Sequence, residues 1–359
     1  MRLSSAIPNI LLMCLLAVLL LGGGCKRGKK LAEGDPAYVT APQVSLRDRL
    51  SAIYNRTGIV KNGEKIEVLE RSKRFARVRS PRGEEGWMEA RYLVGPEIAE
   101  ALEQLAKENA NTPVQAHGTT RAELKMHVTP GRDTDSLYRA PEGAKLDLLK
   151  RATAAKPQPK VVPVKEEERQ SAAPPAPILE DWWLGRDTQG RVGWVLARMV
   201  DIDVPLEIAQ YAEGQRIMAA FVLNKVPDVN EATGEVREVP QYLTIVNEPK
   251  DGTPWDFNQI RVFTWNAKRH RYETAYRERN LYGVFPVTVG HEVFEREGDL
   301  PVFTLRVKDD SGNIVEKRYK LNQPLVRRVL SPEEQKAEEA KRAARLQEAL
   351  QRRAARKRR

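Results

Sequence analysis

Two segments of this chain return further along it in nearly the same order of residue types. The segment NGEKIEVLER at residues 62–71 comes back 80 positions later as EGAKLDLLKR. The segment GWMEARYL at residues 86–93 comes back 107 positions later as GWVLARMV. A duplicated segment indicates a duplicated structural unit, so about half of the chain is predicted to be one small fold used twice. Neither copy carries a catalytic pattern of residues, which favours a binding or scaffold protein over an enzyme.

Turn signals divide the first copy, residues 38–95, into short strands. Asn62-Gly63 and the segment SPRG at residues 80–83 mark tight turns, and apolar residues between them alternate with polar ones. Five short strands in under 60 residues predict a small β-barrel. The second copy, residues 120–203, contains a proline-rich, charged insertion at residues 152–179, which is predicted to be disordered.

The first copy resembles the bacterial SH3-like (SH3b) domain in three motifs. They are V-x-L-R at residues 44–47, G-x-K-x-x-V at residues 63–68 and GWM-x-x-x-YL at residues 86–93. The second copy is similar in its middle and end but has Met126-His127 in place of Leu-Arg, and Gly185 where an aliphatic residue is expected. The resemblance implies two non-catalytic barrels of the kind that bind peptides or glycan-peptide material in the bacterial envelope.

Aromatic side chains are the candidate ligand-binding residues of such barrels, because flat rings give contact area at low entropy cost. Neighbouring residues on a strand face opposite sides, so one of the two adjacent tryptophans is expected in the core and the other on the surface. Trp87 and Trp194, each after a glycine, are expected to fill their barrels. The candidates for ligand binding are Tyr54, Tyr92, Trp182 and Trp183.

The N-terminus has the pattern of an export signal. Arg2 precedes an apolar run from Ile10 to Leu21, which is short for a membrane span, and small residues then lead to Cys25. This boundary resembles the lipobox of bacterial lipoproteins, with Gly22 where a leucine is usual. The resemblance implies a signal peptide at residues 1–24 and lipid attachment at Cys25. The alternative is an uncleaved anchor.

An exported, lipid-anchored body is therefore expected, joined to the membrane by a tether at residues 25–37. Lys26 follows the cysteine, which by the sorting habit of lipoproteins favours the outer membrane if the cell is Gram-negative. The two cysteines, Cys14 and Cys25, both lie in the first 25 residues, so disulfides, thiolate metal sites and cysteine catalysis are excluded from the body.

Three further segments follow the barrels or join them. Residues 96–112 carry an apolar stripe with helical spacing and are predicted to be a linking helix that packs on a barrel. Residues 204–330 contain several alternating segments at short spacing and predict a β-sandwich-like domain. Residues 331–359 begin with Ser331 and Glu334 at capping-box spacing and predict a basic, solvated helical tail.

The net charge of +11 is concentrated at the two ends of the chain. Five of the positive charges lie in residues 2–30, and the tail has ten Lys and Arg against five acidic residues, so the body is nearly neutral. This argues against a nucleic-acid-binding face on the body. The tail is open to two interpretations, contact with an anionic surface or a solubilising helix.

The sequence therefore predicts a mainly β protein, with two SH3-like barrels, a C-terminal β domain, a linking helix and a helical tail. The expected function is that of a non-catalytic, membrane-anchored scaffold of the cell envelope that binds peptidoglycan or an envelope protein. No cofactor or metal is expected. The alternative is a cell-wall hydrolase, or its targeting subunit, whose activity lies in residues 204–330.

Overall fold

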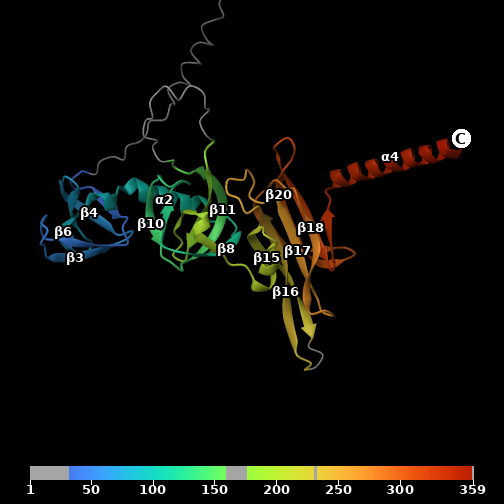
Figure 1. Ribbon diagram of the computed structural model, residues 1–359, viewed down its shortest axis with the longest axis horizontal. Coiled ribbons are helices and arrows are strands. Elements are labelled where there is room, and N and C mark those ends of the chain that lie inside the picture. Colours follow the sequence, from blue (N-terminus) through green and yellow to red (C-terminus); the bar gives the residue numbers. More distant parts are fainter. Residues whose placement is uncertain (1–31, 159–175, 230–232, 358–359) are drawn as a thin grey trace, which may run out of the picture. The chain divides into compact units, whose positions relative to one another are not determined.

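The computed structural model describes residues 32–158, 176–229 and 233–357, which form two compact units, residues 1–96 and 97–359 (Figure 1). The predicted signal peptide and Cys25, the predicted site of lipid attachment, lie outside the described residues, as does most of the proline-rich insertion. The architecture is mainly β with antiparallel sheets, as the sequence predicts.

Barrel 1 is a seven-stranded antiparallel sheet with the order β3-β2-β6-β5-β4-β1-β7. It has two strands more than expected, because the chain enters through β1 and leaves through β7, and these two short strands pair with each other. The alternation of buried and exposed residues in β3 to β6 gives one apolar face, which closes around the core. The strands are β1 (Pro36–Val39), β2 (Gln43–Arg47), β3 (Arg56–Lys61), β4 (Lys65–Ser72), β5 (Phe75–Arg79), β6 (Glu85–Glu89) and β7 (Leu93–Val94).

Barrel 2 repeats this topology strand for strand, with the order β10-β9-β13-β12-β11-β8-β14. The identical order confirms the duplication. The insertion is shorter than predicted, because residues 152–155 extend β11 and pair with β12 as far as Leu179. The strands are β8 (Ala116–Thr120), β9 (Leu124–His127), β10 (Ser136–Ala140), β11 (Lys145–Ala155), β12 (Leu179–Asp187), β13 (Val192–Leu196) and β14 (Val200–Ile202).

The repeated Gly-Trp pair has a packing explanation. A Cβ atom on Gly86 would lie 2.8 Å from the Cβ of Leu46, and one on Gly193 would lie 2.7 Å from the Cβ of Met126. Both distances are too short for real contacts, so β6 and β13 can cross this closely over β2 and β9 only with glycine at that position. The motif therefore marks the barrel closure.

The linking helix α2 (Pro96–Glu108) packs on barrel 2, as predicted, and ends four residues earlier than predicted. Its Leu105 and Ala106 contact a small apolar cluster of Leu149, Leu184 and Val192. Such burial of one apolar face is what stabilises a helix of this length, because an isolated helix of 13 residues is marginal in water.

The C-terminal domain consists of two four-stranded antiparallel sheets that share one core, which agrees with the predicted sandwich. Each sheet is a meander in chain order. A short helix α3 (Leu206–Ala209) and a 3-10 turn (Gln210–Ala212) precede them. The first sheet comprises β15 (Arg216–Val229), β16 (Val236–Asn247), β17 (Gln259–Asn266) and β18 (Arg271–Glu278); the second comprises β19 (Gly283–Phe294), β20 (Gly298–Lys308), β21 (Ile314–Asn322) and β22 (Leu325–Val329).

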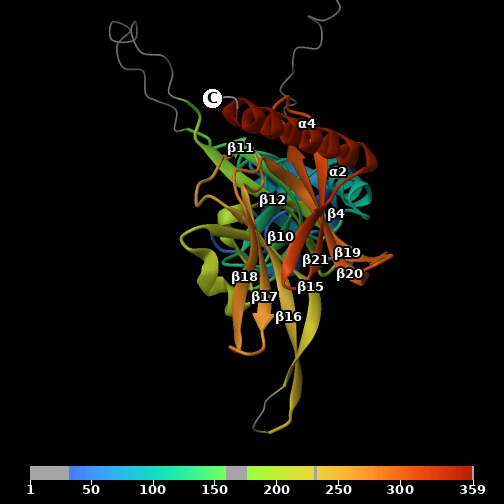
Figure 2. The ribbon, with the colours of Figure 1, turned by 90° about the vertical axis from the view of Figure 1, so that its right-hand side faces the viewer.

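The hairpin of β15 and β16 is much longer than its neighbours. The two strands pair as far as Val229 and Val236, whereas β17 pairs with β16 only between Tyr242 and Val246. Figures 1 and 2 show the resulting arm, which projects beyond β17 and β18. Both strands of the arm carry a proline, and this limits pairing of its open edges with other chains.

Barrel 2 and the C-terminal domain are joined by a continuous core and by buried charges. Trp183 of β12 packs against Phe285 of β19, with ring centroids 5.5 Å apart. Arg151 of β11 donates to Asp181 of β12 at 2.6 Å, and both side chains are at most 2% exposed. Arg151 also donates to the carbonyl oxygen of Trp255 at 2.8 Å. These contacts make residues 97–359 a single unit rather than a chain of separate modules.

The tail forms helix α4 (Pro332–Lys357) with the predicted capping box. The backbone amide of Glu334 donates to the Ser331 hydroxyl at 3.2 Å, and the amide of Ser331 donates to the Glu334 carboxylate at 2.9 Å. Within the described parts of the chain, no helix has both the length and the apolar character that a membrane span requires.

Candidate functional site

The outward face of barrel 1 gathers aromatic rings and arginines from three strands. Arg47 of β2 is paired with Trp87 of β6, which is in turn paired with Arg77 of β5. Because Gly86 and Met88 on either side of Trp87 are buried, the Trp87 side chain lies on the outer surface and is half-buried. Phe75 of β5 is two residues from Arg77 and so shares this face.

Tyr54 joins this face from the loop between β2 and β3. The guanidinium carbon of Arg47 lies 4.4 Å from the centroid of the Tyr54 ring and 5.9 Å from that of Phe75. Arg74 lies 5.3 Å from the Phe75 centroid. We call the group of Arg47, Tyr54, Phe75 and Trp87 the barrel 1 face. Each cation–π contact at such an exposed site stabilises by about 0.5–1 kcal/mol, enough to orient the side chains.

The loop at residues 48–55 is held by a single carboxylate. Asp48 accepts hydrogen bonds from the backbone and side-chain amides of Asn55 at 2.9 and 3.1 Å and from Arg49 at 2.9 Å. The hydrogen bond from Arg49, followed by those from Asn55, lowers the pKa of Asp48 to about 2. The loop nevertheless exposes apolar side chains, since Ile53 is 86% accessible and Leu50 and Tyr54 are also exposed. An ordered loop with exposed apolar residues beside aromatic rings is typical of a binding surface.

The charges around the barrel 1 face are unevenly paired. Arg77 and Arg79 both bind Glu85, at 3.0 and 2.8 Å. Among the residues described, no carboxylate pairs with Arg47 or Arg74, whose guanidinium groups lie over rings instead. The barrel 1 face and the neighbouring Arg74 therefore offer two arginines without a carboxylate partner among the described residues and three aromatic rings, a combination suited to a peptide or sugar that carries carboxylates.

Barrel 2 has different residues at the equivalent positions. Trp194 pairs with His127 as Trp87 pairs with Arg47, so His127 stands at the position of Arg47. By the same register Trp182 stands at the position of Phe75 and Leu184 at that of Arg77. The loop at residues 128–135 corresponds to the loop at 48–55, and each is closed by a hydrogen bond between its first and last residue.

In barrel 2 this face is closed. Nδ1 of His127 lies 3.0 Å from the hydroxyl of Thr134, which occupies the place of Tyr54, and the imidazole contacts the Trp182 ring edge-on at 5.3 Å. Arg132 binds Glu180 through two hydrogen bonds of 2.6 Å and so fixes the loop over the ring. Burial lowers the pKa of His127, and the hydrogen bond from Arg132 lowers that of Glu180.

The expectation that one of the adjacent tryptophans is exposed is wrong. Trp182 is 2% exposed and Trp183 is 1% exposed. Their side chains do point to opposite sides of β12, but the outer side is covered by the loop at 128–135 and the inner side by the C-terminal domain. The sequence pattern gives the alternation correctly and cannot reveal what covers each side.

The expectation that Trp87 and Trp194 fill their barrels is also wrong. Both lie on outer faces and are half-buried, with Trp194 packed in the cluster beneath α2. The inward positions belong to their neighbours Met88 and Val195. Period-two alternation next to the buried glycine would have placed both tryptophans outside, and this is the signal that identifies Trp87 as a candidate site residue.

Tyr92 is not brought into the barrel 1 face by any of the described contacts. It lies in the 3-10 turn Ala90–Tyr92, where its ring packs on the barrel core and its hydroxyl accepts from Arg91 at 2.9 Å. Of the four predicted aromatic residues, Tyr54 alone is both exposed and part of a cluster. Arg47, Phe75 and Trp87 were not among the predicted site residues. Within the described residues, no three His, Cys, Asp or Glu side chains are arranged to hold a metal ion.

Comparison with known families covers the first barrel. The family model described as "Bacterial SH3 domain" matches residues 43–94. Residues 43–94 are a bacterial SH3 domain. The second barrel shares its strand order without a match to a family model of its own. A bacterial SH3 domain fits a binding module associated with the cell wall or with the targeting of a wall hydrolase.

Solved structures with some likeness to the chain are NlpC/P60-type proteins. A NlpC/P60 family protein from Bacillus cereus ATCC 10987 is 9% identical, with 67% of this chain and 93% of that chain covered and a TM-score of 0.22. NlpC2 from Trichomonas vaginalis is 10% identical, and the match covers 84% of this chain and 97% of NlpC2 with a TM-score of 0.16. NlpC1 from the same organism is 9% identical, and the match covers 84% of this chain and 93% of NlpC1 with a TM-score of 0.16. These scores are too low to carry an argument about function. No curated protein sequence matches the chain.

Proposed function

We propose that this chain is a non-catalytic binding protein of the cell envelope, anchored through a lipid on Cys25, whose first barrel captures wall material or an envelope protein. In this proposal barrel 1 supplies the ligand contacts. Barrel 2 and the C-terminal domain belong to one compact unit, residues 97–359.

The observation that carries the proposal is the difference between the two barrels at equivalent positions. Barrel 1 presents Arg47, Tyr54 and Phe75 at the surface, and no carboxylate of the described residues pairs with Arg47. Barrel 2 buries His127 and Trp182 under its own loop. Two copies of one fold therefore differ in the property that a ligand requires, which is access to the rings and charges.

The ligand chemistry follows from the side chains of the barrel 1 face. Arginine binds carboxylates through paired, charge-assisted hydrogen bonds, and tyrosine and tryptophan give large rigid contact areas. Wall peptides and acidic sugars carry carboxylates next to apolar and amide groups. The barrel 1 face matches such ligands better than it matches a purely apolar partner.

The experiment is a pull-down with purified murein sacculi and with envelope lysate, in which the protein without its predicted signal peptide is the bait. Tyr54→Ala and Arg47→Gln are expected to weaken capture by about tenfold or more each, because exposed aromatic and arginine anchors dominate such interfaces. The matched control is Tyr282→Ala, which removes an exposed tyrosine of the C-terminal domain. Capture that is unchanged by Tyr54→Ala and Arg47→Gln, or absent for both wall and protein, would contradict the proposal.

Two further measurements separate the alternatives. Zymography on murein tests the hydrolase hypothesis, and a clear band from the body would overturn the non-catalytic role. Labelling with a lipid precursor tests the anchor. The wild-type chain is expected to incorporate the label and Cys25→Ala is not, whereas equal labelling of both would exclude Cys25 as the attachment residue.

A further inference from the structure

The first sheet of the C-terminal domain carries a polar cavity that the barrels do not share. The cavity has a volume of about 370 Å³ and lies among the end of the 3-10 turn, β17 and the connection from β18 to β19. This volume is within the range of about 300–1,000 Å³ that is typical of sites for small molecules. The lining side chains that concern its chemistry are Glu213, Glu248, Asn258, Gln259, Arg261 and Arg279.

Three arginines meet on this side of the sheet. Arg261 of β17 stands directly opposite Arg277 of β18. Arg279 comes directly after β18 and lines the cavity together with Arg261. Like charges directly opposite each other in a sheet are destabilising. Burial lowers the pKa of Arg261, and the charges of Arg277 and Arg279 lower it further. The fold therefore maintains an unfavourable concentration of positive charge at this place.

One carboxylate neutralises only part of this charge. Glu213 binds Arg261 at 2.9 Å and Arg277 at 3.0 Å. Arg279 has no ion pair or hydrogen bond among the described residues, and it is an exposed residue that lines the cavity. The second acid of the lining, Glu248, accepts a hydrogen bond from Asn258 at 3.1 Å and pairs with none of the three arginines. The three arginines therefore outnumber the two carboxylates beside them, which favours the binding of an anion.

Amide groups surround the arginines. Gln259 is 7% exposed, and its side-chain nitrogen is buried without a hydrogen-bond partner, as is Nε of the buried Arg261. Buried donors without partners are costly and rare in native structures, so these two nitrogens favour a bound group that accepts hydrogen bonds. Asn258 and Asn280 add further amides to the lining. Side-chain amides match the donors and acceptors of peptide groups.

We propose that this cavity binds a short peptide through a free carboxylate. Arg279 and Arg261 bind the carboxylate, and the side-chain amides of Asn258 and Gln259 contact the peptide groups. The site lies on the C-terminal domain and is independent of the ligand of barrel 1. Its failure leaves the proposed function of barrel 1 untouched, and the reverse also holds.

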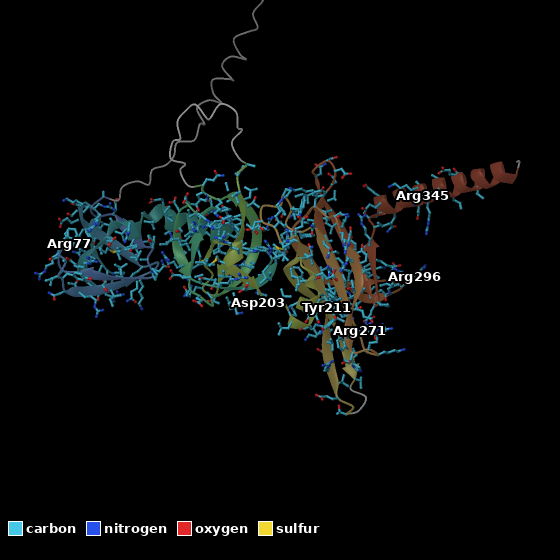
Figure 3. All side chains as sticks on the ribbon, in the orientation of Figure 1. Arg77, Asp203, Tyr211, Arg271, Arg296 and Arg345 are labelled. Atoms are coloured by element: carbon cyan, nitrogen blue, oxygen red, sulfur yellow. The ribbon has the colours of Figure 1, made fainter. Side chains whose placement is uncertain are left out.

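Calorimetric titration of the protein without its predicted signal peptide, with tri-alanine as the ligand, tests this proposal. Binding is expected to weaken about tenfold or more with tri-alanine amide, which lacks the carboxylate, because hydrogen bonds between charged groups are among the strong ones. Arg279→Gln is expected to weaken binding to a similar extent. Arg296→Gln is the matched control, because Arg296 is an exposed arginine of the β19–β20 hairpin, labelled in Figure 3, and does not line the cavity.

A gain of affinity guards against variants that merely misfold. Glu248→Gln removes the acid that repels a carboxylate and is expected to tighten binding of tri-alanine severalfold. Absence of tri-alanine binding, equal binding of tri-alanine and its amide, or no change with Arg279→Gln would overturn the proposal. Inorganic phosphate or glucuronate that binds as tightly as tri-alanine would also overturn it, because the cavity would then be a general anion site rather than a peptide site.

Discussion

Removal of Asp181 should destabilise the whole of residues 97–359, because this carboxylate lies at the joint between barrel 2 and the C-terminal domain. Its two oxygens accept from Arg151 at 2.6 Å, from Arg216 at 3.2 Å and from the backbone amide of Gly252 at 2.8 Å. The first contact stays within barrel 2, and the other two reach the C-terminal domain. A single side chain therefore connects three segments.

The expected size of the effect follows from burial. The side chains of Arg151 and Asp181 are 2% and 1% exposed, so Asp181→Ala leaves a buried guanidinium without its main partner. Breaking a buried ion pair from one side costs about 3–5 kcal/mol. For a unit of this size each kcal/mol lowers the melting temperature by about 2–4 °C, so a decrease of roughly 6–20 °C is expected. Asp256, which contacts Arg151 at 3.3 Å, compensates only in part.

Thermal and urea unfolding followed by tryptophan fluorescence is the suitable assay. Five of the six tryptophans lie in residues 97–359, and Trp87 alone reports on barrel 1. The matched control is Asp201→Ala, which breaks the Arg121–Asp201 pair, where both side chains are 57% exposed. A loss of about 0–1 kcal/mol is expected there. If Asp181→Ala costs no more than Asp201→Ala, the buried charges do not hold the joint together and the reasoning is refuted.

Three other predictions follow from the packing and the pKa shifts. Trp183→Ala should lower the free energy of unfolding by about 3–5 kcal/mol because the ring is fully buried, whereas Trp87→Ala on the outer face should lower it much less. Equal losses in denaturant titrations would contradict the inner position of Trp183 and the outer position of Trp87. Ser331→Ala should lower the stability of helix α4 by about 1 kcal/mol, measured as faster amide exchange in its first turn; unchanged exchange would exclude the capping box. The His127 pKa is lowered below 6.5 and the Glu180 pKa below 4.5, so the unfolded chain binds more protons than the folded one as the pH falls. The closed face of barrel 2 should therefore lose stability first below pH 6.5 and again below pH 4.5. Quenching of tryptophan fluorescence by acrylamide should increase in both ranges. Quenching that does not change between pH 7 and pH 4 would contradict the burial of His127.

Local chemistry in the sequence was sufficient to predict most of the elements. The Asn62-Gly63 turn, the period-two strands, the stripe of α2 and the Ser331 capping box all depend on residues close together in the chain, and all are present in the structure. Strand β22 has no such local pattern, because it is a short segment with two arginines, Arg327 and Arg328, and it depends on pairing with β21.

The site was predicted less well, because exposure is a property of what packs on each face. The same strand alternation puts Phe75 at the surface of barrel 1 and Trp182 under a loop in barrel 2. Nothing in the residues near Trp182 indicates that Arg132 reaches Glu180, 48 positions away, and fixes that loop. Arg261 and Arg277, beside the C-terminal cavity, likewise meet only through the pairing of β17 with β18 and through their shared partner Glu213.

By itself, then, the sequence determined that the chain contains one small barrel twice, since a repeat of turns, strands and the Gly-Trp closure specifies the same local folding steps in both copies. Tertiary structure decided that the two copies are not equivalent. In barrel 2 the faces beside β12 are covered by a loop, by α2 and by the C-terminal domain, so burial removes the surface that a ligand would need. Barrel 1 keeps that surface because no described element of its own unit covers Arg47 and Tyr54.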